Sequence, residues 1–417
     1  MTIAAIIAEY NPFHNGHEYM IRKVKEETGA DYVIVAMSGD FTQRGIPGIA
    51  DKHTRAKMAV SCGADAVFEL PVRFATAGAE QFATGAVSLF TSLSCVDTLA
   101  FGSECGDLSD FSKASELLLN EPEDFKQSIQ KKLRQGYSYP KAFALAVKDS
   151  QHAATVSPEL LENPNNLLGV EYMKALKKLA SSIRPHTITR TGTGYHDSHT
   201  AYSKESDTLI ASASAIRSAL TSSTGTISRA QPLLPFDAYR IFAESYGVSA
   251  PVTPDDFSLL LSTRIAAETK ESLSSFLDVP KELADRIYSF RDEFLPFTEL
   301  ISAIKHKQFT YARINRALLH ILLGLKELPA TDALTPLVPY ARLLSMKKSA
   351  SPLMKEIKEH SQIPVITKPA DARKVLDGHA LNMFLEDVSA ADLYNRVVSY
   401  KFGTEFVTDM RRSIELI

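Results

Sequence analysis

The fold is decided by the stretch Ile3-Ala4-Ala5-Ile6-Ile7-Ala8-Glu9-Tyr10-Asn11-Pro12-Phe13-His14-Asn15-Gly16-His17 near the N-terminus. Its first six residues are apolar and predict a buried β-strand. The residues after His17 are amphipathic at helical spacing, and Gly29 is placed to end that helix. A strand, a turn with a glycine and a helix start predict a phosphate site, because free backbone N–H groups and the helix dipole attract anions.

Two histidines, His14 and His17, stand in the turn between this strand and helix. Imidazole N–H groups donate hydrogen bonds to phosphate oxygens, so the pair is expected to stabilise charge that builds up in a transition state. Gly16 would let a nucleotide approach without a Cβ in the way. The pattern resembles the H-x-G-H signature of the nucleotidyltransferases related to class I aminoacyl-tRNA synthetases. The alternative is a pair of surface histidines at a helix start.

Composition limits the classes of protein that fit. The chain has 417 residues, which predicts two or three domains, and its 45% hydrophobic and 23% charged residues are typical of a soluble globular protein. A net charge of −3 argues against a uniformly basic nucleic-acid binder but allows a local basic face. The three cysteines lack metal-type spacing, and there is no signal peptide or membrane-spanning run. We therefore expect a cytoplasmic protein with no membrane partner.

Apolar runs alternate with helical patterns over the first hundred residues. This rhythm predicts an α/β fold, a Rossmann-like doubly wound parallel sheet of the nucleotidyltransferase type, with ligands at the carboxyl ends of its strands. Further expected strands are residues 32–37, 66–70, 98–103 and 187–190, and the expected helices between them are residues 52–62 and 79–93.

The later part of the chain is mostly helical in pattern. Residues 108–180 read as a helical insertion, and a polar stretch at 221–226 indicates a domain boundary. We expect a catalytic ATP-binding domain over residues 1–220 and a mainly α-helical domain over 221–417, with a strand near 338–345 as an exception.

A second phosphate-binding element is expected at Ser212-Ala213-Ser214-Ala215-Ile216-Arg217. Small hydroxyl residues at a helix N-terminus bind phosphate, and Arg217, one turn further on, is placed to reach the β- or γ-phosphate. The segment departs from the synthetase version in having no lysine, so Arg217 is expected to supply that positive charge. A serine-capped helix start is the alternative.

Polar residues also follow the second and third strands. Asp40 is a candidate to hold a metal or the amine of an acceptor, and Arg44 to hold a carboxylate or phosphate. The alternative for this loop is a capped turn with a surface ion pair. Glu69, at the end of an apolar strand, is expected either to be paired or to line the site.

Two basic segments in the last domain suggest contact with a phosphate backbone. The alternative is a solvated charged face. Residues 301–326 contain Lys305, Lys307, Arg313, Arg316 and Lys326 and no acidic residue; residues 342–374 contain Arg342, Lys347, Lys348, Lys355, Lys358, Lys368, Arg373 and Lys374 against Glu356, Glu359 and Asp371.

Over nearly its whole length the chain resembles the bacterial tRNA(Met) cytidine acetate ligase family. The histidine motif alone indicates only the superfamily, and the other stretches narrow the resemblance. The motifs that carry it are Ala8-Glu9-Tyr10-Asn11-Pro12-Phe13-His14-Asn15-Gly16-His17, Met37-Ser38-Gly39-Asp40-Phe41-Thr42-Gln43-Arg44-Gly45, Phe68-Glu69-Leu70-Pro71, Phe101-Gly102-Ser103-Glu104 and Pro164-Asn165-Asn166.

The resemblance implies a two-step ligase reaction. Acetate attacks the α-phosphorus of ATP to give acetyl-adenylate and pyrophosphate, and N4 of the wobble cytidine of elongator tRNA(Met) then takes the acetyl group. The expected partners are that tRNA and acetate, and not DNA. A magnesium ion is expected with the ATP, although no residue is identified as its ligand.

The resemblance also implies which residues serve the reaction. His14 and His17 are catalytic, and our interpretation of the cleft adds Asp40, Arg44 and Ser214. From the residues alone, Asn165 and Asn166 could read an adenine edge or simply cap a helix, and capping is the commoner role for asparagine at such a place. The residues implied for ATP binding are Ile7, Ala8, Glu9, Tyr10, Asn11, Pro12, Phe13, His14, Asn15, Gly16, His17, Glu18, Tyr19, Met20, Gly102, Asn165, Arg190 and Thr191.

Two other functions compete with the ligase. A small-molecule adenylyltransferase of coenzyme biosynthesis would use the same core, but it leaves the helical half and the basic segments without a purpose. A non-catalytic tRNA- or ribosome-binding protein that retains a nucleotide site is the other alternative.

Overall fold

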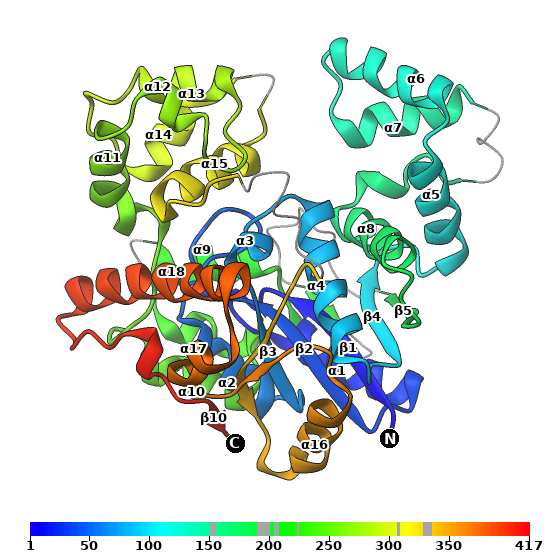
Figure 1. The fold of residues 1–417 in the computed structure, drawn as a ribbon, viewed down its shortest axis with the longest axis vertical. Coiled ribbons are helices and arrows are strands. Elements are labelled where there is room, and N and C mark those ends of the chain that lie inside the picture. Colours follow the sequence, from blue (N-terminus) through cyan, green and yellow to red (C-terminus); the bar gives the residue numbers. More distant parts are fainter. Residues whose placement is uncertain (151–155, 190–200, 204–207, 223–224, 307–308, 328–335) are drawn as a thin grey trace.

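A mixed β-sheet forms the centre of the molecule (Figure 1). The computed structural model describes residues 1–150, 156–189, 201–203, 208–222, 225–306, 309–327 and 336–417. The strand order is β10-β8-β3-β2-β1-β4-β5, with β9 paired to β8, and β6 and β7 form a separate hairpin. The strands are β1 (Ile3–Ala8), β2 (Tyr32–Ser38), β3 (Ala66–Leu70), β4 (Thr98–Ser103), β5 (Arg184–Thr189), β6 (Ala201–Ser203), β7 (Thr208–Ile210), β8 (Ala341–Met346), β9 (Val365–Ile366) and β10 (Glu415–Leu416).

The first five strands pair in parallel. This confirms the predicted Rossmann-like α/β sheet. The chain moves outward from β1 to β3 on one side and then returns to place β4 on the other side of β1. In open α/β sheets such a reversal leaves a crevice at the carboxyl ends of the strands, where ligands bind.

Successive residues of each central strand face opposite sides of the sheet. Ala5 packs in a core that includes α4 (Ala79–Leu93), whereas Ile6 packs in a second core that includes α1 (Asn15–Thr28). Because both faces are covered, β1 is apolar throughout and β2 is nearly so, which is why they were recognisable as continuous apolar runs.

Two groups of helices rise on the side of the sheet that lies away from both termini (Figure 1). One group interrupts the chain between β4 and β5, as expected for residues 108–180, and the other has its own apolar core. The helices of the two groups are α5 (Leu108–Asn120), α6 (Glu123–Arg134), α7 (Tyr139–Lys148) and α8 (Pro164–Lys178), and α11 (Ser258–Ala266), α12 (Lys270–Leu273), α13 (Lys281–Tyr288), α14 (Phe297–Ile304) and α15 (Tyr311–Leu323).

The remaining helices cover the sheet or cross its edge. None of the helices in the described ranges combines the length and the apolar character that crossing a bilayer requires. They are α2 (Lys52–Ser61), α3 (Val72–Ala75), α9 (Ala213–Thr221), α10 (Phe236–Ser245), α16 (Ser351–His360), α17 (Ala372–Val375) and α18 (Gly378–Phe402).

The C-terminal half completes the central sheet. β8 pairs antiparallel with β3, and both β9 and β10 pair with β8. Every residue of β8 is buried. The strand therefore belongs to the central sheet and not to a separate helical domain. The sheet thus takes strands from both sides of the boundary expected at residue 220, and the two-domain division stays a prediction.

Candidate active site

A cavity of about 360 Å³ opens at the carboxyl ends of β1 and β4, where the strand order reverses. It receives residues from β1, β4, α1, α8 and the start of α9. Most of the residues predicted from the sequence lie together in its wall. These are Ile7, Ala8, Glu9, Tyr10, Asn11, His14, Gly16, His17, Tyr19, Met20, Arg44, Gly102, Asn165, Ser214 and Arg217.

Other predicted residues are not in the wall. Phe13 is fully buried in the core beside α1. Asn15 donates from Nδ2 to the backbone oxygen of Leu209 at 2.8 Å, so it fastens α1 to β7. Arg190 and Thr191 lie outside the described residues. The predicted residues found away from the cavity wall are Pro12, Phe13, Asn15, Glu18 and Asp40.

The backbone fixes the tautomer of both histidines. His14 is the N-cap of α1, and its Nδ1 accepts from the N–H of Gly16 at 3.1 Å. The Nδ1 of His17 accepts from the N–H of His14 at 3.2 Å. A neutral imidazole that accepts at Nδ1 carries its proton on Nε2. Each ring therefore has an Nε2–H donor. The same two hydrogen bonds that form the capping box of α1 leave the proton of each ring on Nε2.

The two imidazole rings stack on one another, with centroids 3.6 Å apart and planes 23° apart. A Cβ on Gly16 would lie 3.1 Å from Cε1 of His14, so a side chain at this position would crowd that ring. Gly16 also lies in the cavity wall, and its expected role in admitting the nucleotide stays a prediction.

Two arginines meet at Ser214, which is also in the cavity wall. The Arg217 guanidinium donates to Ser214 Oγ at 3.1 Å and to the backbone oxygen of Asn11 at 2.7 Å. Arg44 donates to the same Oγ at 3.4 Å. Burial lowers the pKa of Arg217 to about 10, partly opposed by the Glu9 carboxylate, so the group is still cationic at neutral pH. Two positive groups around one hydroxyl suit a polyanion.

An apolar wall faces these polar groups. Phe82, Phe101, Leu167, Leu168 and Tyr172 contribute to it from α4, β4 and α8. Sequence reasoning did not identify these residues as part of a site. Their apolar character gives no signal that separates a cavity wall from an ordinary core, and only the folded arrangement shows the difference.

Arg55 of α2 holds the backbone beneath the cavity. This fully buried side chain donates to the carbonyl oxygens of Glu9 at 2.6 Å, Ala50 at 2.9 Å and Ser38 at 3.2 Å. The carbonyls of Glu9 and Ser38 belong to the ends of β1 and β2. Arg55 therefore fixes the turn that leads into the histidine motif, a role that its place near a helix start did not reveal.

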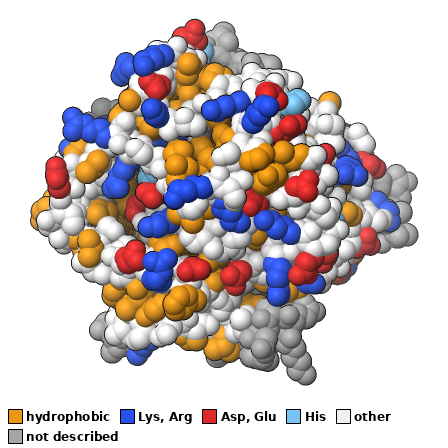
Figure 2. Space-filling model, turned by 90° about the horizontal axis from the view of Figure 1, so that it is seen from below, with side chains coloured by type: hydrophobic (Ala, Val, Ile, Leu, Met, Phe, Trp, Pro, Cys, Tyr) orange, Lys and Arg blue, Asp and Glu red, His pale blue; other side chains and the backbone are white. Residues whose placement is uncertain are grey.

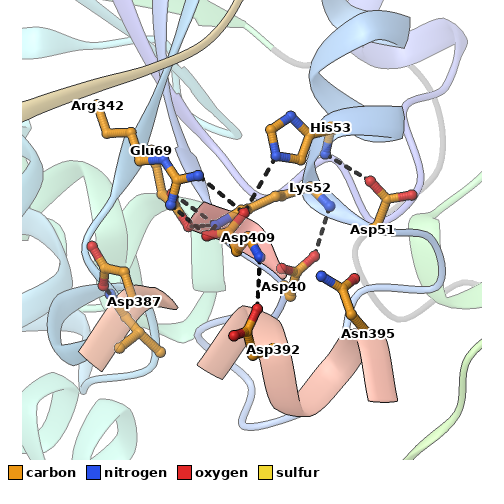
Figure 3. A network of polar contacts seen from close by, with 12 residues as sticks. Asp40, Asp51, Lys52, His53, Glu69, Arg342, Asp387, Asp392, Asn395 and Asp409 are labelled. Atoms are coloured by element: carbon orange, nitrogen blue, oxygen red, sulfur yellow. Dashed lines mark hydrogen bonds and ion pairs between the residues drawn. The ribbon is translucent and has the colours of Figure 1, made fainter. Parts of the chain in front are cut away.

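A buried ionic network surrounds Lys52, the first residue of the same helix (Figure 3). Lys52 Nζ is 2.8 Å from both Glu69 Oε1 and Asp409 Oδ2, and Arg342 Nη1 is 2.5 Å from Asp409 Oδ2 and 3.1 Å from Glu69 Oε2. Burial alone would raise the pKa of Asp409, but Lys52 and Arg342 hold it well below its usual range. Glu69 is therefore paired, which resolves the alternative left open from the sequence, and the network joins β3 to the C-terminal segment.

Asp40 belongs to this network and not to the cavity (Figure 3). Its Oδ1 accepts from the backbone N–H of Lys52 at 2.7 Å, and burial raises the pKa of Asp40 to about 6. The carboxylate thus binds the start of α2. Because Asp40 does not line the cavity, it has no part in the mechanism proposed below.

Asp40, which the sequence offered as a candidate to hold a metal, instead accepts from the backbone of Lys52. The described residues contain no cluster of three or more His, Cys, Asp or Glu side chains suited to a metal. Glu9 is a carboxylate in the cavity wall, where its Oε1 accepts from the N–H of Gln43 at 2.8 Å.

Comparison with known proteins agrees with this fold. A family model described as HIGH Nucleotidyl Transferase matches residues 1–406, which places the chain in that class. A tRNA(Met) cytidine acetate ligase of Acetivibrio thermocellus is 36% identical over 96% of both chains, and one of Clostridium novyi is 35% identical over 96% of this chain and 97% of its own. The chain belongs to the tRNA(Met) cytidine acetate ligase family.

Solved structures show the same fold. The apo structure of Thermotoga maritima TmcAL superposes with a TM-score of 0.90, at 27% identity over the whole of both chains. A second structure of that protein, bound with α-thio ATP, superposes with a TM-score of 0.88 over the same extent.

Proposed function

We propose that this protein works in the cytoplasm as an ATP-dependent ligase that acetylates N4 of the wobble cytidine of elongator tRNA(Met). The observation that carries this proposal is a single cavity whose wall holds two histidines, each with its Nδ1 bonded to the backbone, and two arginines that converge on Ser214. Its relatives are named tRNA(Met) cytidine acetate ligases, and a related structure holds α-thio ATP. ATP is therefore the nucleotide that we assign to the cavity.

The reaction has two steps. In the first, an acetate oxygen forms a bond to the α-phosphorus of ATP while the bond from that phosphorus to the bridging oxygen breaks, and pyrophosphate leaves. In the second, N4 of cytidine attacks the acetyl carbon, the bond from that carbon to the phosphate oxygen breaks, AMP leaves and N4 loses a proton. Activation is needed because the cytosine amine is a poor nucleophile whose lone pair is delocalised into the ring.

The residues of the cavity suit the first step. The Nε2–H groups of His14 and His17 are placed to donate to oxygens that gain charge at the α-phosphate, an electrostatic contribution to catalysis. Arg217 and Arg44, converging on Ser214, hold the outer phosphates and then the pyrophosphate. Magnesium, which neutralises a bound triphosphate, would find in Glu9 an oxygen ligand of the kind that it prefers.

The tRNA contact is proposed on the group of helices that includes α15. The basic segment 301–326 lies partly in α14 and α15, and α15 reaches the cavity-side loop at Gly45. A Cβ on Gly45 would lie 2.4 Å from the backbone nitrogen of Arg316, and the residue has φ +72°, so both space and backbone require glycine. The basic helix thus borders the loop that carries Arg44, and it could guide a phosphate backbone toward the cavity.

The second basic segment, residues 342–374, supports a tRNA contact less well. Arg342 is buried in the ionic network, and Lys347 Nζ lies 3.0 Å from Asp65 Oδ1. Figure 2 shows basic and acidic side chains intermixed on the face of the molecule seen from below. Intramolecular pairing therefore accounts for part of the positive charge in this segment.

The direct test is to incubate the purified protein with ATP, acetate and elongator tRNA(Met) and to digest the tRNA for nucleoside analysis. We expect N4-acetylcytidine only when all three substrates are present, together with pyrophosphate and AMP. Nucleosides without N4-acetylcytidine under these conditions would contradict the proposal. Release of pyrophosphate with pantetheine or nucleotide phosphates in place of acetate would support the small-molecule adenylyltransferase instead.

A further inference from the structure

Glu104, directly after β4, forms hydrogen bonds with two neighbouring asparagines of α8. Its backbone N–H donates to Asn166 Oδ1 at 2.9 Å, and its Oε1 accepts from Asn165 Nδ2 at 2.6 Å. These bonds join the motifs Phe101–Glu104 and Pro164–Asn166. Neither asparagine side chain makes the capping bond that we considered from the sequence, since the N-cap of α8 is residue 163.

The turn that carries Glu104 is itself held firmly. Ser103 Oγ accepts from the N–H of Gly106 at 2.9 Å and from the hydroxyl of Thr187 at 2.7 Å. Gly106 has φ +68°, and a Cβ there would lie 2.3 Å from Thr189 Oγ1. The carboxylate of Glu104 therefore has a fixed position relative to α8.

This fixed carboxylate determines which way the Asn165 amide points. A carboxylate only accepts hydrogen bonds, so the amide atom that faces Glu104 has to be the NH₂ group. The carbonyl Oδ1 then lies on the side of the same planar group that is turned away from Glu104, and Asn165 is part of the cavity wall. Within the described part of the chain, no hydrogen bond to this Oδ1 is formed, so it is available to accept one from a ligand.

The surroundings of Asn165 suit a base and not the phosphates. Its neighbours in α8, Pro164, Leu167 and Leu168, also line the cavity and are apolar, as is Phe101 of β4. The histidines and arginines that suit the triphosphate come from α1, α9 and the loop after β2. A planar base against this apolar wall would meet one hydrogen-bond acceptor, the Asn165 carbonyl oxygen.

We infer that Glu104 is a positioning residue that locks the Asn165 amide with its carbonyl oxygen toward the base, and so selects adenine through its N6 amine. A base with a keto oxygen at that position, such as hypoxanthine, would place two acceptors face to face and is disfavoured. The inference rests on the proposed function, because it takes ATP as the nucleotide of the cavity.

The test compares ATP with ITP, which replaces the N6 amine by oxygen, in acetate-dependent pyrophosphate exchange. We expect the wild-type protein to prefer ATP in kcat/KM by at least about tenfold. In Glu104→Gln the preference should fall about tenfold, mainly through KM for ATP, because glutamine both donates and accepts and no longer dictates the amide orientation. Cys105→Ser, an exposed neighbour in the same turn, should keep the wild-type preference.

A double-mutant cycle separates positioning from a general loss of structure. Once Asn165→Ala has removed the acceptor, adding Glu104→Gln should not change the ATP/ITP ratio further. An unchanged ATP/ITP ratio in Glu104→Gln would overturn the inference. It would also be overturned if Glu104→Gln changed only the preference for ATP over 2′-deoxy-ATP, because 2′-deoxy-ATP retains the N6 amine. Failure of the wild-type protein to exchange pyrophosphate with ATP and acetate would instead contradict the proposed function.

Discussion

His17→Ala is expected to slow acetate-dependent formation of pyrophosphate about 100- to 1000-fold in kcat. The structure gives His17 an Nε2–H donor by engaging its Nδ1 with the backbone N–H of His14. Such a donor acts on charge that grows as acetate adds to the α-phosphorus, so its loss should affect the rate far more than ATP binding. Single-turnover measurement of pyrophosphate release at saturating ATP would give the rate directly.

The matched control for this variant is His360→Ala, which removes an exposed histidine of α16 far along the chain from the cavity residues. It should react at the wild-type rate. Because His17 also takes part in the capping box of α1, circular dichroism and ATP titration should confirm that the His17→Ala protein is folded and binds nucleotide. A rate within about tenfold of the wild type would show that His17 does not stabilise the transition state.

Asp409→Ala is expected to destabilise the protein by about 3–5 kcal/mol. Asp409 lies between Lys52 and Arg342, and all three side chains are almost completely buried. Its removal leaves Lys52 and Arg342 to share Glu69 as the one carboxylate still within ion-pair distance of them among the described residues, and an uncompensated buried charge is costly. The change should appear as a lower midpoint in urea denaturation followed by circular dichroism.

The control is Asp371→Ala, which removes an exposed ion pair in which Asp371 Oδ1 lies 2.6 Å from Lys374 Nζ. Exposed pairs contribute little, so the midpoint of this variant should match that of the wild type. If Asp409→Ala were as stable as Asp371→Ala, the network would not be needed to fasten the C-terminal segment to the sheet.

The central strands and the histidine motif were predictable because their signals are local. β1 and β2 are continuous apolar runs, and His14-Asn15-Gly16-His17 lies directly between a strand and a helix. The strand at β8 was also visible as an apolar segment. Its partner was not, because pairing with β3 joins residues far apart in sequence and leaves no trace in either segment alone.

Polar residues were harder to place than apolar ones. Arg342 appeared to belong to a basic surface, but Asp409, 67 residues further on, binds it in the interior. Asp40 was rightly placed after a strand, yet its side chain turns inward to the backbone of Lys52. Spacing in the sequence shows on which loop a charge lies, but its direction depends on partners that only the fold brings near.

The most direct test of the account uses acetate labelled with ¹⁸O in both oxygens. If acetate attacks the α-phosphorus in the cavity beside His14 and His17, one acetate oxygen remains on the phosphate when the acetyl group passes to cytidine. Mass spectrometry should therefore find one ¹⁸O in each AMP formed with N4-acetylcytidine. Unlabelled AMP, with the ¹⁸O in pyrophosphate or inorganic phosphate, would contradict this chemistry.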